Sequence, residues 1–183
     1  TNYWNSSYLQ TADIDLEENS FIEPIGIAGN WFEGEYDGGL FTIANWAYTG
    51  SSTGTGLFGY CNGAALKRIR LSGVWTSTGG SYAGLLWGYA ISSTVNDVDG
   101  DFSAGTLINA SNYSRTGGMF GFVKEGALTG VSVRGTLDVQ GYVNSGGGVI
   151  GYVYDGASVT QCHNLATFPS GITGYDVGGI VGK

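Results

Sequence analysis

An internal repeat with a period near thirty residues constrains the fold more than any other feature of this chain. Two large apolar residues, a glycine and an aromatic residue recur as Leu57-Phe58-Gly59-Tyr60, Leu86-Trp87-Gly88-Tyr89, Met119-Phe120-Gly121-Phe122 and Val149-Ile150-Gly151-Tyr152. A fifth copy begins at Ile180-Val181-Gly182, so the glycines are 29, 33, 30 and 31 residues apart. A period of that length indicates a repeated supersecondary unit rather than one face of a helix. We refer to each copy as a marker.

A second pattern follows the markers and predicts a bend between two short strands. An apolar residue, two mostly polar residues, another apolar residue and strand-like alternation recur, and the two-residue step reverses the alternation, so the chain must turn there. The five predicted bend pairs are Ala44-Asn45, Lys67-Arg68, Asn96-Asp97, Thr129-Gly130 and Thr160-Gln161. This alignment also predicts one inward row that contains Trp46, Ile69, Val98, Val131 and Cys162.

Short strands, bends and this period together predict an all-β parallel β-helix of about five coils, each 29–33 residues long. Glycine supplies 34 of the 183 residues, yet 42% are hydrophobic, which leaves enough apolar surface for a core. So much glycine and threonine disfavours an α-helical solenoid, and a β-sandwich is the structural alternative. We expect one domain over residues 1–183, with a lead-in and first coil at 1–50 and repeat coils at 51–182. We also expect the chain to be a fragment of a longer protein.

The net charge and the hydrophobic pattern disfavour two classes of partner, nucleic acids and membranes. The net charge of −8 would repel a nucleic-acid backbone, so nucleic-acid binding is not expected. No run of 18 apolar residues is present, so we expect no membrane insertion by this segment. Few charges and many Ser, Thr, Asn, Gly and Tyr residues suit a protein that works outside the cell.

A family resemblance covers the chain from Tyr8 to Lys183, and its lead-in is the specific part. The stretch "YLQTADIDLEENSFIEPIG" from Tyr8 is followed by "FEGEYDGGLFTIANW" from Phe32 and then by "GLFGY" from Gly56. This order resembles the GLUG-type repeat proteins, although Gly39-Leu40 departs from the usual family pattern. The resemblance implies a right-handed parallel β-helix. It also implies a non-catalytic segment of a bacterial adhesin, a secreted peptidase or a viral surface protein.

The marker strands present large apolar side chains on both faces, which predicts a binding surface. Whichever face points inward, the other must be covered by a subunit, another domain, a loop of this chain or a ligand. Because Phe58 and Tyr60 have the same strand parity, as do the corresponding pairs in the next coils, we expect them to share a face. The candidate binding residues are Phe58, Tyr60, Trp87, Tyr89, Phe120, Phe122 and Tyr152.

Acidic residues suggest two further sites. Asp97, Asp99 and Asp101 alternate beside a glycine and could bind calcium, although the full twelve-residue calcium loop is absent; the alternative is a solvated bend. Asp13 and Asp15 could form a catalytic carboxylate pair, although the resemblance implies a structural role. No clear row of basic residues facing acids is apparent in the sequence, and this disfavours an enzyme.

The remaining reactive side chains predict little chemistry. His163 is the only histidine, is expected to point outward, and cannot by itself build a multi-histidine metal site. Cys61 and Cys162 fall in different rows several coils apart, which predicts no disulfide between them.

These observations favour a non-catalytic structural or adhesive segment of an extracellular, cell-surface or virion-surface protein. We expect it to engage other domains, subunits or glycans through a lateral face and to need no cofactor beyond possible calcium. The alternative is a polysaccharide-degrading β-helix enzyme, either a lyase or a glycoside hydrolase.

Overall fold

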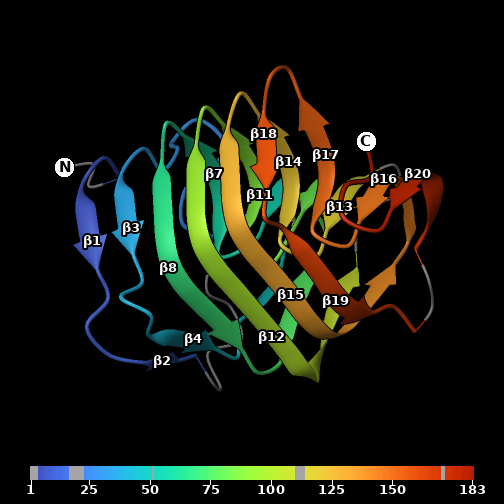
Figure 1. The fold of residues 1–183 in the computed structure, drawn as a ribbon, viewed down its shortest axis with the longest axis horizontal. Coiled ribbons are helices and arrows are strands. Elements are labelled where there is room, and N and C mark those ends of the chain that lie inside the picture. Colours follow the sequence, from blue (N-terminus) through green and yellow to red (C-terminus); the bar gives the residue numbers. More distant parts are fainter. Residues whose placement is uncertain (1–3, 17–22, 51, 110–113, 170–171) are drawn as a thin grey trace.

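The computed structural model describes residues 4–16, 23–50, 52–109, 114–169 and 172–183. Over these residues the chain forms β-strands and no helix, and its paired strands run parallel in a solenoid of about five turns (Figure 1). The predicted all-β coiled architecture is therefore confirmed.

Three parallel sheets form the sides of the solenoid in the described part of the chain. The long sheet contains β1 (Ser7–Leu9), β2 (Ile14–Asp15), β3 (Glu35–Asp37), β4 (Thr42–Ala44), β5 (Ala47–Thr49), β8 (Ala65–Ser72), β9 (Trp75–Thr78), β12 (Thr94–Asn109), β15 (Ala127–Gln140), β18 (Ser158–Thr160) and β19 (His163–Thr167). The marker sheet contains β7 (Phe58–Asn62), β11 (Trp87–Ile91), β14 (Phe120–Lys124) and β17 (Ile150–Tyr154). The third sheet contains β6 (Gly54–Thr55), β10 (Tyr82–Ala83), β13 (Ser114–Gly117), β16 (Tyr142–Gly147) and β20 (Thr173–Gly178).

Each central coil passes through the three sheets in the same order. In one coil the chain runs from β10 in the third sheet to the marker strand β11 and on to β12 in the long sheet, and the next coil repeats this as β13, β14 and β15. Equivalent strands of successive coils therefore pair side by side, about 4.8 Å apart. The repeat period in the sequence is one turn of this solenoid.

The inward row is in register across three coils. Val98 on β12 lies opposite Ile69 on β8 and Val131 on β15, and all three side chains are buried. Stacking like residues above one another buries apolar surface that a single coil would leave exposed. This register confirms the central part of the predicted row.

The bends also lie where the sequence predicts them. The second residue of each predicted bend pair has a positive φ: Asn45 59°, Arg68 52°, Asp97 59°, Gly130 65° and Gln161 53°. A single left-handed residue redirects the chain and reverses the strand alternation. The recurring two-residue step is thus the sequence signature of this backbone turn.

The prediction that Trp46 belongs to the row of Ile69, Val98 and Val131 is wrong. The bend before Trp46 corresponds to a later bend of the coil than the one before Ile69. Ala47 pairs with Thr76, and the Trp46 ring lies 5.6 Å from that of Trp75, so Trp46 stacks on Trp75 rather than on Ile69. Asn45 stands level with Gly73, whose φ is 81°. The error arises because positive-φ bends occur more than once in a coil, so a bend pattern alone does not assign the phase.

The marker strands change face at their glycine, which corrects a second expectation. Phe58, Trp87, Phe120 and Ile150 belong to the fully buried interior, together with Cys61, Ala90 and Val123. The aromatic residue after each glycine lies on the opposite face and contacts rings outside the core. The prediction that Phe58 and Tyr60 share a face is therefore wrong, because the marker strand does not alternate regularly through the glycine.

Candidate binding groove

Four aromatic side chains on the outer face of the marker sheet form a continuous stack. Tyr60, Tyr89, Phe122 and Tyr152 are successive partners in the parallel register, and we call them the outer aromatic ladder. Tyr89 and Phe122 stack at 4.7 Å with 6° between their planes, and Phe122 and Tyr152 stack at 5.5 Å with 9°. Because these rings use their faces on one another, a ligand meets mainly their edges.

Residues of the same chain cover part of the ladder. Tyr82 on β10 packs its ring edge-to-face against Tyr89 at 4.8 Å and against Phe122 at 5.5 Å. Trp31 lies 5.5 Å from Tyr60 at the other end. Phe122 is consequently only 8% exposed. The predicted cover is thus supplied in part by the third sheet and by the lead-in.

An open pocket of about 240 Å³ remains where the marker and third sheets meet. Its lining residues are Tyr82, Arg115, Phe122, Tyr152 and Tyr154, and we also refer to this pocket as the groove. Tyr154 is half exposed, so it offers a ring surface that the stacked rings do not. The pocket therefore combines aromatic walls with one basic group.

Arg115 is held in the pocket by rings rather than by acids. Its guanidinium carbon lies 5.0 Å from the centre of the Tyr152 ring, 5.4 Å from that of Tyr82 and 5.8 Å from that of Phe122. Its Nε is buried without a hydrogen-bond partner, and no carboxylate of the described residues forms an ion pair with it. Cation–π contact holds the guanidinium in place but leaves its charge uncompensated.

Two lysines at the rim differ from Arg115 because acids neutralise them. Lys124 lies 6.0 Å from the centre of the Tyr154 ring and pairs with Glu125 at 3.3 Å. Lys183 lies 6.0 Å from the centre of the Tyr152 ring and pairs with Asp176 at 3.5 Å. Among the three described cations that contact the pocket rings, only Arg115 therefore has no acidic partner.

Burial raises the pKa of two tyrosines of the outer aromatic ladder. Desolvation raises the pKa of Tyr60 and of Tyr89 above the ordinary value for tyrosine. At neutral pH both groups remain neutral and able to donate a hydrogen bond.

The structure separates the seven predicted binding residues into two groups. Tyr60, Tyr89, Phe122 and Tyr152 form the outer aromatic ladder, and two of them, Phe122 and Tyr152, also line the pocket. The other three, Phe58, Trp87 and Phe120, have no exposed surface, so a binding role for them is corrected to a core role.

Sequence reasoning missed three pocket residues: Tyr82, Arg115 and Tyr154. A signal for two of them was present. Tyr82 and Arg115 each stand six positions before a marker glycine, at 88 and 121, and they pair directly in the third sheet. Aligning the chain on the marker glycines would have stacked them. The residue type does not recur at this position, so it forms no visible motif.

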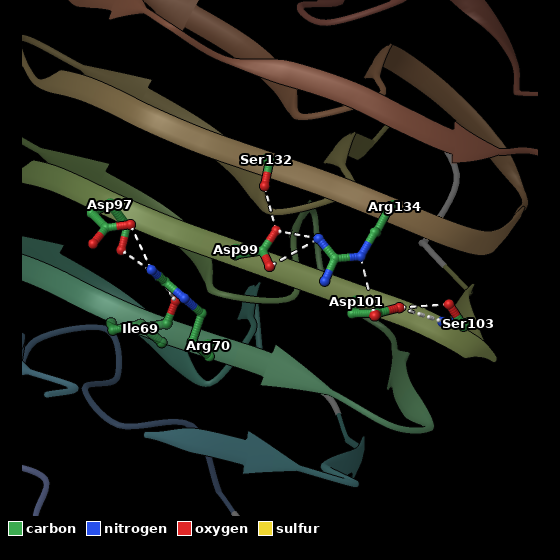
Figure 2. Close-up of polar contacts among 8 residues, drawn as sticks. All are labelled: Ile69, Arg70, Asp97, Asp99, Asp101, Ser103, Ser132 and Arg134. Atoms are coloured by element: carbon green, nitrogen blue, oxygen red, sulfur yellow. Dashed lines mark hydrogen bonds and ion pairs between the residues drawn. The ribbon is translucent and has the colours of Figure 1, made fainter. Parts of the chain in front are cut away.

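The three candidate calcium ligands are engaged by arginines on the outer face of the long sheet (Figure 2). Arg70 Nη2 donates to Asp97 Oδ1 at 2.8 Å. Arg134 binds Asp99 through Nη1 at 3.0 Å and Asp101 through Nε at 3.1 Å. Among the residues that the structure describes, no group of three His, Cys, Asp or Glu side chains could hold a metal ion.

These contacts belong to an ion-pair ladder that joins four successive coils. Lys67 and Arg68 on β8 pair with Glu35 and Asp37 on β3, Arg70 on β8 pairs with Asp97 on β12, and Arg134 on β15 pairs with Asp99 and Asp101 on β12. The expectation that no row pairs basic residues with acids is therefore wrong. The sequence predicts the bends. It does not show which long side chains these bends bring together across neighbouring coils.

The ion-pair ladder predicts that the folded chain loses stability at low pH. The hydrogen bond from Arg68 is the main cause that lowers the pKa of Asp37 to about 2. Because the folded pKa lies below the unfolded value of about 3.9, this group stabilises the fold above pH 4 and loses that effect as the pH falls toward 2. The urea midpoint of the wild-type chain should therefore fall over this range. The midpoint of Asp37→Asn should change less, and equal changes for the two proteins would contradict the assignment.

The other candidate residues show structural contacts. Asp13 Oδ1 accepts a hydrogen bond from the Thr42 amide at 2.7 Å, and Asp15 Oδ1 accepts one from Asn45 Nδ2 at 2.9 Å. His163 is exposed, as expected. Cys61 is buried and Cys162 half-buried; both thiols are free, and burial raises the pKa of each.

Comparison of the chain with protein-family models, with curated proteins and with solved structures found no match in any of the three. The GLUG resemblance therefore stays a prediction that depends on the lead-in and the markers. Over the described residues, no helix is long and apolar enough to cross a membrane.

Proposed function

We propose that this solenoid is a non-catalytic recognition segment of a cell-surface or virion-surface protein, and that it binds glycan in the groove between the marker and third sheets. The observation that carries the proposal is the open pocket lined by Tyr82, Arg115, Phe122, Tyr152 and Tyr154.

The form of the groove supports a sugar as ligand. The half-exposed ring of Tyr154 offers an apolar surface with a polar tip, which suits a sugar ring that is itself apolar on one face and hydroxylated at its edge. At about 240 Å³ the pocket is smaller than the roughly 300–1,000 Å³ typical of sites for drug-sized ligands. That size fits one ring-sized unit of a chain whose remaining units extend along the solenoid.

The ion-pair ladder is the feature that an enzyme reading would use, and its electrostatics favour a structural role. A general acid at neutral pH needs a pKa raised toward 7. Arg68 instead lowers the pKa of Asp37, and hydrogen bonds from Ser103 and Arg134 lower that of Asp101. Carboxylates held ionised by arginines stabilise the pairing of coils but are poor proton donors.

A glycan array, followed by mass spectrometry of the recovered ligands, tests the proposal. Binding without cleavage is expected for the wild-type chain, and released products would instead support the lyase or hydrolase alternative.

Tyr154→Ala should weaken binding of an array ligand roughly five- to tenfold, because one exposed stacking surface is lost. Tyr175→Ala is the matched control, since Tyr175 is an exposed tyrosine on β20 that contacts Tyr142 rather than the pocket. Equal losses in the two variants, or no array binding at all, would contradict the proposed site.

A further inference from the structure

The groove contains a positive charge that the protein itself leaves unbalanced. The chain has 15 acidic and 7 basic residues, so an arginine without an acidic partner is unusual for its surface. In the ion-pair ladder Arg68, Arg70 and Arg134 each have a carboxylate partner, whereas Arg115 has none among the described residues.

Resting on the glycan-binding function proposed above, we infer that the groove selects acidic sugars, and that Arg115 binds the carboxylate of a uronic or sialic acid residue. The three rings around Arg115 hold the guanidinium and exclude water from part of it, as the buried Nε shows. A partly desolvated cation attracts an anion more strongly than one in open water. Guanidinium also matches the geometry of a carboxylate with two parallel hydrogen bonds.

The neighbouring charges direct the carboxylate to Arg115 rather than to the rim. Lys124 and Lys183 are each paired with an acid, so an incoming carboxylate would compete with Glu125 or Asp176 there. At Arg115 no such exchange is needed. The exposed ring of Tyr154 lines the same pocket and can stack on the sugar that carries the acid.

The test uses an array of uronic and sialic acid oligosaccharides, each printed beside the same oligosaccharide with its carboxyl groups reduced to alcohols. Wild-type protein should bind at least one acidic member about tenfold more tightly than its reduced partner, which corresponds to one charge-assisted hydrogen-bond pair. The preference should shrink as the salt concentration rises.

Two arginine variants assign the preference to its residue. Arg115→Gln should lose the preference, and Arg115→Lys should keep part of it because the charge remains. Arg134→Gln is the matched control, since Arg134 lies on the outer face of the long sheet and already binds Asp99 and Asp101. Circular dichroism melts of all variants separate a loss of binding from a loss of folding. Should Arg115→Gln unfold, Arg115→Lys and the reduced ligands still decide the matter.

The outcomes distinguish this inference from the function on which it rests. If acidic and reduced sugars bind equally well and Tyr154→Ala weakens both, the groove is a glycan site but the acidic selectivity is wrong. A preference that persists in Arg115→Gln also overturns the inference. If no member of the array binds, both the inference and the proposed function are wrong, and a protein partner becomes the occupant to test.

Discussion

Gly121→Ala is expected to destabilise the solenoid by about 3 kcal/mol, near the upper end of the usual cost of forcing extra atoms into a packed interior. A Cβ on Gly121 would lie 2.5 Å from the carbonyl oxygen of Gly88 and 2.6 Å from the amide nitrogen of Ala83. Both neighbours are backbone atoms of other strands, so no side chain can rotate away. The marker glycine is therefore required because the third sheet passes directly against the marker strand.

Chemical denaturation of the purified chain measures this effect as a lower midpoint at unchanged slope. Gly179→Ala is the matched control because a Cβ there meets no heavy atom within 4 Å. Neither glycine has a positive φ, so the comparison isolates the steric contact from backbone strain. Equal stability of the two variants would show that the sheets do not approach each other at the marker.

The sequence was sufficient for the architecture because a solenoid repeats its physical constraints in every coil. The glycines at 59, 88, 121 and 151 all face the backbone of a neighbouring strand, and the bend residues all need a left-handed φ. Such constraints recur in phase and are visible without an alignment. The stacked row of Ile69, Val98 and Val131 follows from them.

The candidate site was less predictable because its parts lack that regularity. Strand parity put Phe58 and Tyr60 on one face, and the irregular geometry at Gly59 separates them. In the third sheet the position of Tyr82 holds Arg115 in the next coil and Ser145 in the one after. The residue type at this position differs from coil to coil. A pattern of residues that recur in every coil therefore does not reveal the site.

Phe120→Ala is expected to cost about 3–5 kcal/mol of unfolding free energy, the usual range for removing a fully buried phenylalanine. The Phe120 side chain has no exposed surface, and its ring lies 4.9 Å from that of Trp87 in the coil before. Strands on both sides hold the backbone in register with Trp87 and Ile150. The cavity left by the ring can therefore close only in part.

Phe122→Ala provides the comparison across the same glycine. Phe122 is nearly as buried, at 8% exposed, but side chains of the groove cover it rather than the core. Phe122 also lines the open pocket, so water can fill the space that its ring leaves, and the expected cost is about 1–2 kcal/mol because little empty cavity remains. Under conditions where both variants stay folded, Phe122→Ala should weaken glycan binding and Phe120→Ala should not. The reverse order of stabilities would place Phe122 inside and Phe120 outside, and would remove the structural basis of the groove.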